Sequence, residues 1–274
     1  MALRDAPVCL IAGAGDVGQR VARLRADCGD DVLTLRRREV GGAPGQRALQ
    51  ADLASGRGLD QLPRQIERVV FCAAPDERGE AAYRALYRDG LLRLLDRIDC
   101  PRWLFVSSTA VYGEDAGKWV DETTPANPPQ FNGRVLREAE ACLAPHPGAV
   151  ILRCSGLYGP GREAMLRRAR EPVAGRPHWT NRLHVDDAAA AISHLLDLPR
   201  PQRLYIGSDD QPVREAELLD WLRARMDLPV QGMIAGAETG RRLRNSVLRG
   251  SGWKPACPDF RAGYAALTDT ARSS

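Results

Sequence analysis

Apolar and polar residues alternate in blocks along most of the chain. Short apolar runs bounded by glycine or polar turns are typical of parallel strands that are covered on both faces. Segments with apolar residues at helical spacing lie between several of these runs. The expected strands are 8–12, 31–35, 47–50, 68–73, 103–106, 149–153 and 204–206, and the expected helices among them are 17–28, 79–98, 131–143 and 188–198. This alternation predicts an α/β fold with a Rossmann-type, doubly wound parallel sheet.

The pattern changes beyond residue 160, where shorter helices and strands are separated by loops rich in proline and glycine. We expect residues 1–159, with a contribution from about 181–206, to form the Rossmann domain. Residues 160–180 and 207–274 are expected to form a small C-terminal lobe.

The first strand leads into three glycines, Gly13, Gly15 and Gly18, with the spacing Gly-x-Gly-x-x-Gly. In dinucleotide sites the first glycine makes a tight turn, the second lets a diphosphate approach, and the third lets the helix pack closely. The N-terminus of that helix, at Asp16 and Val17, also attracts phosphate. Similar turns occur at many strand-to-helix junctions and in S-adenosylmethionine enzymes, so the motif alone does not identify a nucleotide site.

The second strand ends in Arg36, Arg37 and Arg38. An acidic residue at this place would bind the adenosine 2′-hydroxyl of NAD, whereas arginine accommodates the 2′-phosphate of NADP. Arg36 stands where the acid is expected, which predicts NADP rather than NAD. The alternative is a solvated strand end without a ligand.

Other candidate residues follow the later strands. Asp52 and Leu53 follow the third strand, where the carboxylate either lies near an adenine amine or caps a helix. Cys72, Ala73 and Ala74 follow the fourth strand, where small side chains either leave room for a cofactor or serve packing. In a parallel sheet the carboxyl ends of the strands share one edge, so this edge should bring together the glycine turn, Arg36, Asp52, Ala73, Ser108 and Ser155.

Composition narrows the possible functions. The chain has 274 residues, 44% of them hydrophobic, and a net charge of +4. The basic residues are dispersed, which argues against a nucleic-acid or membrane partner. Seven cysteines at irregular spacing indicate free thiols in a reducing, cytoplasmic compartment. The four histidines show no metal-ligand spacing with one another or with cysteine, so no metal site is expected. We also expect no signal peptide and no membrane-spanning segment.

Several motifs then agree in order along nearly the whole chain. After the glycine turn come Asp52-Leu53, Ala73-Ala74, the segment Val106 to Gly113, Leu152-Arg153, the segment Tyr158 to Arg162, and His184-Val185-Asp186-Asp187. In this the chain resembles the extended short-chain dehydrogenase/reductase superfamily, in particular the atypical, YeeZ-like subgroup of the NAD(P)-dependent epimerase/dehydratase family.

The resemblance implies a Rossmann-type sheet with a C-terminal lobe that binds the substrate, commonly a nucleotide sugar. It implies that Ser108 is the hydroxyl that binds the substrate oxygen. Together with the strand-end pattern, it assigns cofactor binding to Gly13, Gly15, Asp16, Val17, Gly18, Arg36, Arg37, Asp52, Leu53, Cys72, Ala73, Ala74, Ser107 and Ser155.

The chain departs from the family at its catalytic pair. The family uses a Tyr-x-x-x-Lys pair on the helix after strand five, in which tyrosine passes a proton while hydride moves. Here Asn132 occupies the tyrosine position and Leu136 the lysine position. No tyrosine of the chain has a lysine four residues later, and only Tyr158 has a cation there, Arg162. Unconventional proton donors would be Thr109, Tyr112 or His184, each of which also has an ordinary structural role.

Two functions remain open. The first is an NADP(H)-binding, epimerase/dehydratase-like protein that acts on a nucleotide sugar or another small carbonyl or hydroxyl compound. The second is a non-catalytic NADP(H) sensor or scaffold that acts through a protein partner. We expect a monomer or a homodimer, because dimers of the family pair the helices that correspond to 79–98 and 131–143.

Overall fold

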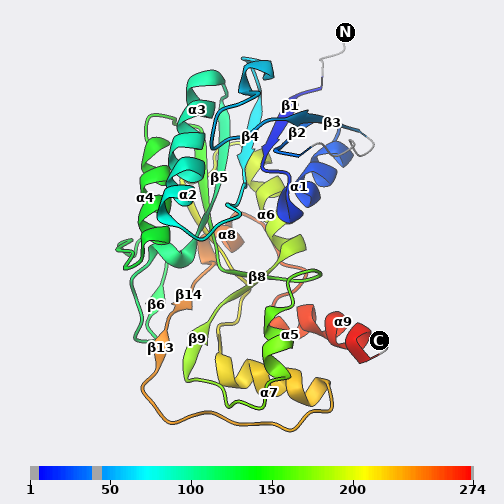
Figure 1. Cartoon of the computed structure of the whole chain (residues 1–274), viewed down its shortest axis with the longest axis vertical. Helices are drawn as coiled ribbons and strands as arrows, with labels where there is room; N and C mark the ends of the chain where they lie inside the picture. The colour runs from blue at the N-terminus through cyan, green and yellow to red at the C-terminus, as the bar shows by residue number, and fades with distance from the viewer. Residues whose placement is uncertain (1–5, 39–44, 273–274) are drawn as a thin grey trace. The chain divides into compact units, whose positions relative to one another are not determined.

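The computed structural model describes residues 6–38 and 45–272 (Figure 1). Contacts divide these residues into two compact units. The first unit comprises residues up to 112 together with 126–153 and 189–205, and the second comprises 113–125, 154–188 and residues from 206 onward. The chain therefore passes between the two units several times. Residues 113–125, 154–159 and 181–188 belong to the second unit, whereas the sequence led us to expect them in the Rossmann domain.

A seven-stranded sheet dominates the first unit. Its strand order is β11-β7-β5-β4-β1-β2-β3. The strands are β1 (Val8–Ala12), β2 (Asp31–Arg36), β3 (Gln46–Gln50), β4 (Arg68–Phe71), β5 (Arg102–Ser108), β7 (Ala149–Cys154) and β11 (Leu204–Gly207). Because the chain proceeds from β1 to β2 in one direction and continues with β4 and β5 in the other, the order reverses between β1 and β4. This arrangement confirms the predicted Rossmann-type α/β fold.

The central strands are apolar on both faces because helices cover them. Leu10 of β1 is opposite Leu33 of β2 and Val69 of β4, and all three are buried. In Figure 1, α2 (Glu80–Tyr83), α3 (Gly90–Arg97) and α4 (Phe131–Cys142) lie together beside the strands. A π-helical segment, Arg84–Asp89, joins α2 to α3, so residues 80–97 form one continuous helical stretch, close to the predicted helix 79–98.

Two other helices, α1 (Asp16–Asp27) and α6 (Val185–Asp197), are linked by a buried ion-pair network. Arg25 on α1 contacts Asp30 at 2.7 Å and Asp197 at 2.6 Å, and its side chain is only 2% exposed. Arg68 of β4 contacts the other oxygen of Asp30 at 2.8 Å. Two cations thus share two carboxylates, which ties together α1, the turn before β2, β4 and the end of α6.

The second unit consists of small sheets and short helices. Its strand groups are β8 (Gly156–Tyr158) with β10 (Arg182–His184), β9 (His178–Thr180) between β12 (Val213–Arg214) and β13 (Thr239–Gly240), and β6 (Trp119–Val120) with β14 (Arg242–Leu243). Its helices are α5 (Ala164–Ala169), α7 (Glu215–Arg225), α8 (Ser246–Gly250) and α9 (Phe260–Arg272). The buried core includes Tyr158, Leu166, Leu219, Phe260 and Tyr264. Three short strands, β6, β8 and β9, lie outside the strands expected from the sequence.

Arginines and tryptophans alternate on the surface of the second unit. The guanidinium of Arg214 lies 4.6 Å from the centre of the Trp179 ring, and Arg242 lies 5.0 Å from Trp179 and 5.1 Å from Trp119. The guanidinium of Arg244 lies 4.9 Å from the centre of the Trp119 ring. Cation–π contacts of this kind join β9, β12, β6 and the region of β14.

Candidate functional site

The three glycines of the turn between β1 and α1 have different surroundings. Gly13 has a φ of +101°, and a Cβ there would overlap the backbone of Ala73, so only glycine fits. A Cβ at Gly18 would overlap the carbonyl oxygen of Gly13, which explains how α1 packs against the turn. A Cβ at Gly15 would meet nothing within 4 Å. Two of the glycines therefore serve packing inside the protein, and Gly15 presents open backbone.

The N-terminus of α1 is available to an anion. Gly15 is the N-cap residue and supplies no side-chain hydrogen bond to the first turn. Such a helix end carries partial positive charge and unpaired N–H groups. Asp16 is the acidic residue of the first turn, and its carboxylate accepts a hydrogen bond from Arg20 at 2.9 Å. Val17, by contrast, is buried and contributes to the core.

Arg36 lies at the end of β2, next to the first turn of α1. With the Gln19 amide oriented so that its oxygen faces the guanidinium, Arg36 Nε donates to that oxygen at 3.3 Å. Arg37 is half exposed and forms an ion pair of 2.6 Å with Asp76, from the loop after β4. This hydrogen bond from Arg37 lowers the pKa of Asp76. Two guanidinium groups thus lie at the carboxyl edge of the sheet, and one already has an acidic partner.

Asp52 has a structural role within its own turn. Its carboxylate accepts hydrogen bonds from the backbone N–H of Ala54 at 3.0 Å and from the Ser55 hydroxyl at 2.8 Å. Partial burial raises the pKa of Asp52, but these hydrogen bonds outweigh it and lower the pKa overall. Leu53 is buried, and its carbonyl oxygen accepts from Arg93 at 3.3 Å. The Asp52 side chain therefore closes a turn and does not cap a helix, because the next helical segment begins only at Leu59.

The segment after β4 packs against the glycine turn. The Cys72 thiol donates to the carbonyl oxygen of Gly13 at 3.2 Å, and Ala73 fills the space that Gly13 leaves. Ala74 is exposed. A larger residue at Ala73 would displace the turn, so the small side chain has a definite packing reason.

Ser107 and Ser108 end β5 and have different environments. Ser107 is buried and donates to Glu140 at 2.7 Å, and Glu140 also pairs with Arg153 at 2.7 Å. Burial raises the pKa of Glu140, but the contacts with Arg153, Ser107 and Arg137 lower it overall. Ser108 is partly exposed, and its hydroxyl accepts from the backbone N–H of Ala110 at 3.2 Å. Ser107 therefore belongs to a buried network that positions the strand end, whereas the Ser108 hydroxyl has no acceptor among the described residues.

Helix α4 carries Asn132 and Leu136, which are expected from the sequence to occupy the positions of the family's tyrosine and lysine. Asn132 is half-buried in the first turn, and Leu136 is 4% exposed and packs in the core. A Cβ at Gly133 would overlap the carbonyl oxygen of Ala110, which fixes the close approach of α4 to the turn after β5. Neither Asn132 nor Leu136 can exchange a proton near neutral pH.

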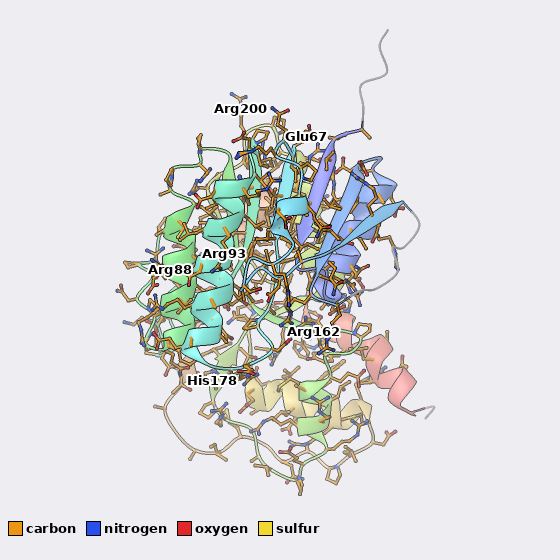
Figure 2. All side chains as sticks on the ribbon, turned by 45° about the horizontal axis from the view of Figure 1, so that its top comes forward. Glu67, Arg88, Arg93, Arg162, His178 and Arg200 are labelled. Atoms are coloured by element: carbon orange, nitrogen blue, oxygen red, sulfur yellow. The ribbon has the colours of Figure 1, made fainter. Side chains whose placement is uncertain are left out.

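Two tyrosines that the sequence offers as candidates, Tyr112 and Tyr158, are buried. Tyr112 is fully buried, with the Arg153 guanidinium 4.9 Å from its ring centre. Tyr158 is 1% exposed and stacks on Tyr264 at 4.5 Å. Burial, with the nearby Cys257 and Asp209, raises the pKa of Tyr158. Arg162 is exposed and is labelled in Figure 2. Because Tyr158 lies in the core of the second unit, we do not assign it a catalytic role with Arg162.

Ser155 and a group of three potential metal ligands lie in the second unit. The Ser155 hydroxyl is buried and has no hydrogen-bond partner among the described residues. Potential ligand atoms of His184, Asp187 and Cys257 all lie within 4.8 Å of one another. The spacing of residues along the sequence gave no sign of this group, because Cys257 is separated from the others by α6, β11 and α7.

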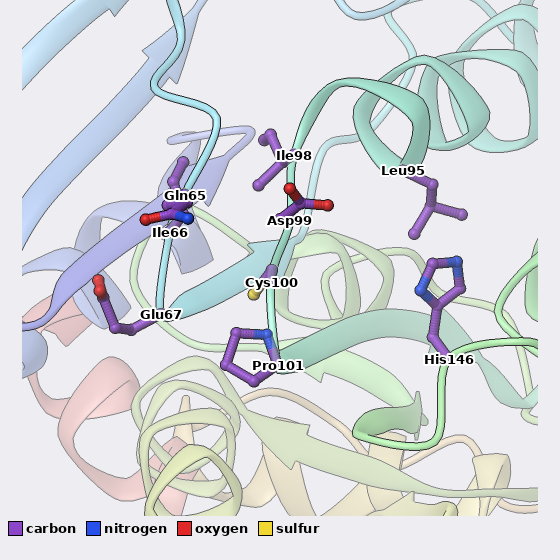
Figure 3. A pocket seen from close by; sticks show the side chains of 9 residues that line it. All are labelled: Gln65, Ile66, Glu67, Leu95, Ile98, Asp99, Cys100, Pro101 and His146. Atoms are coloured by element: carbon purple, nitrogen blue, oxygen red, sulfur yellow. The ribbon is translucent and has the colours of Figure 1, made fainter.

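A hollow of ≈ 520 Å³ lies at the opposite edge of the sheet, before the start of β4 and β5. Its lining includes Glu67, Asp99, Cys100 and His146, and Figure 3 shows Glu67 and His146 at its two ends. This is the amino edge of the strands, where doubly wound folds do not bind their cofactors. We therefore do not identify it with the nucleotide site.

Comparison with known proteins identifies the family. The model of the NAD dependent epimerase/dehydratase family matches residues 9–207. The chain belongs to the NAD-dependent epimerase/dehydratase family. A segment of 107 residues is 43% identical to Protein YeeZ of Escherichia coli K12, and this segment spans 38% of the chain and only 39% of that relative.

Solved structures agree with this family membership over the whole chain. A protein of Methylobacillus flagellatus, described as an NAD-dependent epimerase/dehydratase, superposes with a TM-score of 0.84 at 37% identity and covers 98% of this chain and 99% of its own. WbmG of Bordetella bronchiseptica, solved in complex with NAD, has a TM-score of 0.80 at 19% identity and covers 100% of this chain and 98% of its own. The second similarity shows the epimerase/dehydratase fold only. Among the described residues, no helix is long and apolar enough to cross a bilayer.

Proposed function

We propose that this member of the epimerase/dehydratase family binds NADP(H) at the glycine turn and acts on a small carbonyl or hydroxyl compound such as a nucleotide sugar. One observation carries the proposal: Gly15 presents open backbone at an uncapped helix N-terminus, and Arg36 lies beside the same helix turn. A diphosphate suits the first feature and a 2′-phosphate suits the second.

The residues present fit such a cofactor. The Gly13–Gly18 turn and the start of α1 would hold the diphosphate, and Arg36, with Arg37, would face the 2′-phosphate. The bound cofactor would supply hydride transfer. Ser108 would bind the reacting oxygen of the substrate through its free donor hydrogen. Asn132 would donate a hydrogen bond without transferring a proton, so the proton must come from another group or from solvent.

Cofactor titration tests the proposal. NADPH and NADH are titrated against the full chain by calorimetry, first with the wild type and then with Arg36→Ala. Loss of a charge-assisted hydrogen bond to phosphate should weaken NADPH binding roughly 10-fold or more and leave NADH binding nearly unchanged. Arg200→Ala is the matched control, because Arg200 precedes β11 at the opposite edge of the sheet (Figure 2). If neither NADPH nor NADH binds the wild type, the proposal is refuted.

The second candidate is a non-catalytic NADP(H) sensor or scaffold. Asn132 and Leu136 favour it, because the usual proton donor and its lysine are both replaced by residues that do not titrate usefully. Cofactor oxidation with a panel of carbonyl compounds and nucleotide sugars separates the two candidates. Turnover of cofactor by the wild type supports the first candidate, an active enzyme. Binding without turnover, together with turnover gained in the double variant Asn132→Tyr and Leu136→Lys, supports the sensor.

A further inference from the structure

Three side chains in the second unit have the composition of a transition-metal site. His184 ends β10, Asp187 lies in the first turn of α6, and Cys257 lies in the loop before α9. The imidazole, carboxylate and thiol ligand atoms lie within 4.8 Å of one another. Zn²⁺ bonds of ~2.0–2.3 Å place tetrahedral ligands roughly 3.3–3.8 Å apart, so side-chain movements of about 1 Å would close the site.

The backbone already holds two of these residues together. The Asp187 carboxylate accepts the backbone N–H of Ala256 at 2.7 Å and that of Cys257 at 3.0 Å. Asp187 is 2% exposed, so its position is fixed by the fold. Each carboxylate oxygen retains a further lone pair for a cation. The residue that supplies one ligand therefore also orients the loop that supplies another.

The imidazole is positioned by its neighbours. Tyr158 packs edge-on against the His184 ring, with centroids 5.2 Å apart and planes at 81°. The Nδ1 atom of His184 faces Asp186, 3.6 Å from its carboxylate Oδ2 and 3.3 Å from its backbone nitrogen. Only 12% of the His184 side chain is exposed. Metal-binding histidines typically turn their second ring nitrogen toward a carboxylate such as that of Asp186.

A second observation points to a polar occupant near this group. The hydroxyls of Tyr158 and Tyr264 and one carboxylate oxygen of Asp209 are buried and have no hydrogen-bond partner among the described residues. Tyr158 contacts both His184 and Tyr264. All three residues are at most 1% exposed. Buried polar atoms nearly always have partners, so such a cluster requires a bound water or ion close by.

We propose that His184, Asp187 and Cys257 bind one Zn²⁺ ion, or a similar divalent transition metal, within the second unit. Three protein ligands of nitrogen, oxygen and sulfur leave a fourth position for water. That water would be a hydrogen-bond partner for the buried polar atoms beside it. The ion would link β10 and α6 to the loop before α9. All three ligands belong to the second unit, and none of them was assigned to cofactor binding.

Cobalt absorption tests the site directly. The full chain is stripped of metal with a chelator, desalted and titrated with Co²⁺ under reducing conditions. We expect one equivalent to bind with thiolate-to-cobalt charge-transfer absorption and with the visible bands of a tetrahedral ion, both displaced by Zn²⁺. Cys257→Ser should remove the charge-transfer band and weaken Zn²⁺ binding on the order of 100-fold or more, because a thiolate ligand is lost. Cys28→Ser, at an exposed cysteine of the first unit, should leave both unchanged.

Circular dichroism establishes that each variant is folded. If Cys257→Ser does not fold, His184→Gln takes its place, because it removes a ligand and preserves the backbone contacts of Asp187. Absence of a charge-transfer band in the wild type overturns the proposal. So does a band that persists in folded Cys257→Ser or is unaffected by His184→Gln.

Discussion

Asp209 should make the protein less stable as the pH rises from acidic to mildly basic values. Its side chain is 1% exposed, and one carboxylate oxygen has no partner among the described residues. Burial raises the pKa of Asp209 from 3.8 to about 8, although the N–H of Gln211 and the charge of Arg182 oppose the change. Between these two values the folded protein binds more protons than the unfolded chain, so the free energy of unfolding falls as pH increases.

The magnitude follows from that difference. A tenfold change in proton affinity corresponds to ~1.4 kcal/mol, so the ionised carboxylate should cost on the order of 5 kcal/mol above pH 8 and almost nothing below pH 4. Asp209→Asn removes the charge and retains an oxygen that can accept from Gln211. The variant should match the wild type at acidic pH and become progressively more stable than it toward basic pH.

Urea denaturation across this pH range, with a chelator present, measures the difference. Glu163→Gln is the matched control, because it removes one negative charge from an exposed position of the same unit that does not affect the pKa of Asp209. It should give a difference of less than ~1 kcal/mol at every pH. A constant difference between Asp209→Asn and the wild type at all pH values would refute the reasoning.

Two further predictions concern the first unit. Asp30→Asn should lower the free energy of unfolding by about 3 kcal/mol in urea denaturation, because Arg25 and Arg68 lose a buried partner. Asp31→Asn is the control: it removes an exposed ion pair with Arg47 and should change that free energy by less than ~1 kcal/mol. Gly13→Ala should destabilise by about 2 kcal/mol or more because of its positive φ and the overlap with Ala73. Gly15→Ala should have a free energy of unfolding within ~0.5 kcal/mol of the wild type, yet it should bind NADPH more weakly. An equal loss of stability in both glycine variants would contradict the packing role of Gly13 and the open backbone at Gly15.

The sequence predicted those features that depend on neighbouring residues in the chain. Gly13, Gly15 and Gly18 lie within six consecutive positions, so their spacing alone reports a strand, a turn and a helix start. The apolar strands were equally visible, because a strand covered on both faces has few polar positions. Membership of the epimerase/dehydratase family and the Rossmann-type sheet could therefore be predicted.

Features that depend on tertiary contacts could not be predicted in the same way. Asp52 was compatible with either an adenine contact or a cap, and only the positions of Ala54 and Ser55 show that it closes its own turn. Cys257 and His184 are far apart in sequence, and the N–H contacts of Asp187 bring them together. The cofactor specificity and the roles assigned to Ser108, Ser107 and Ser155 stay predictions that the proposed titrations and activity assays address.

The distribution of tryptophan gives the two units separate optical signatures. Of the five tryptophans, Trp103 lies in β5 of the first unit, and the other four, Trp119, Trp179, Trp221 and Trp253, lie in the second. The arginines that stack against Trp119 and Trp179 make their emission sensitive to the integrity of that surface. Intrinsic fluorescence should therefore follow mainly the second unit, while far-ultraviolet circular dichroism follows both. Two curves that coincide would show a single cooperative transition, and two that separate would reveal how independently each half of the molecule melts.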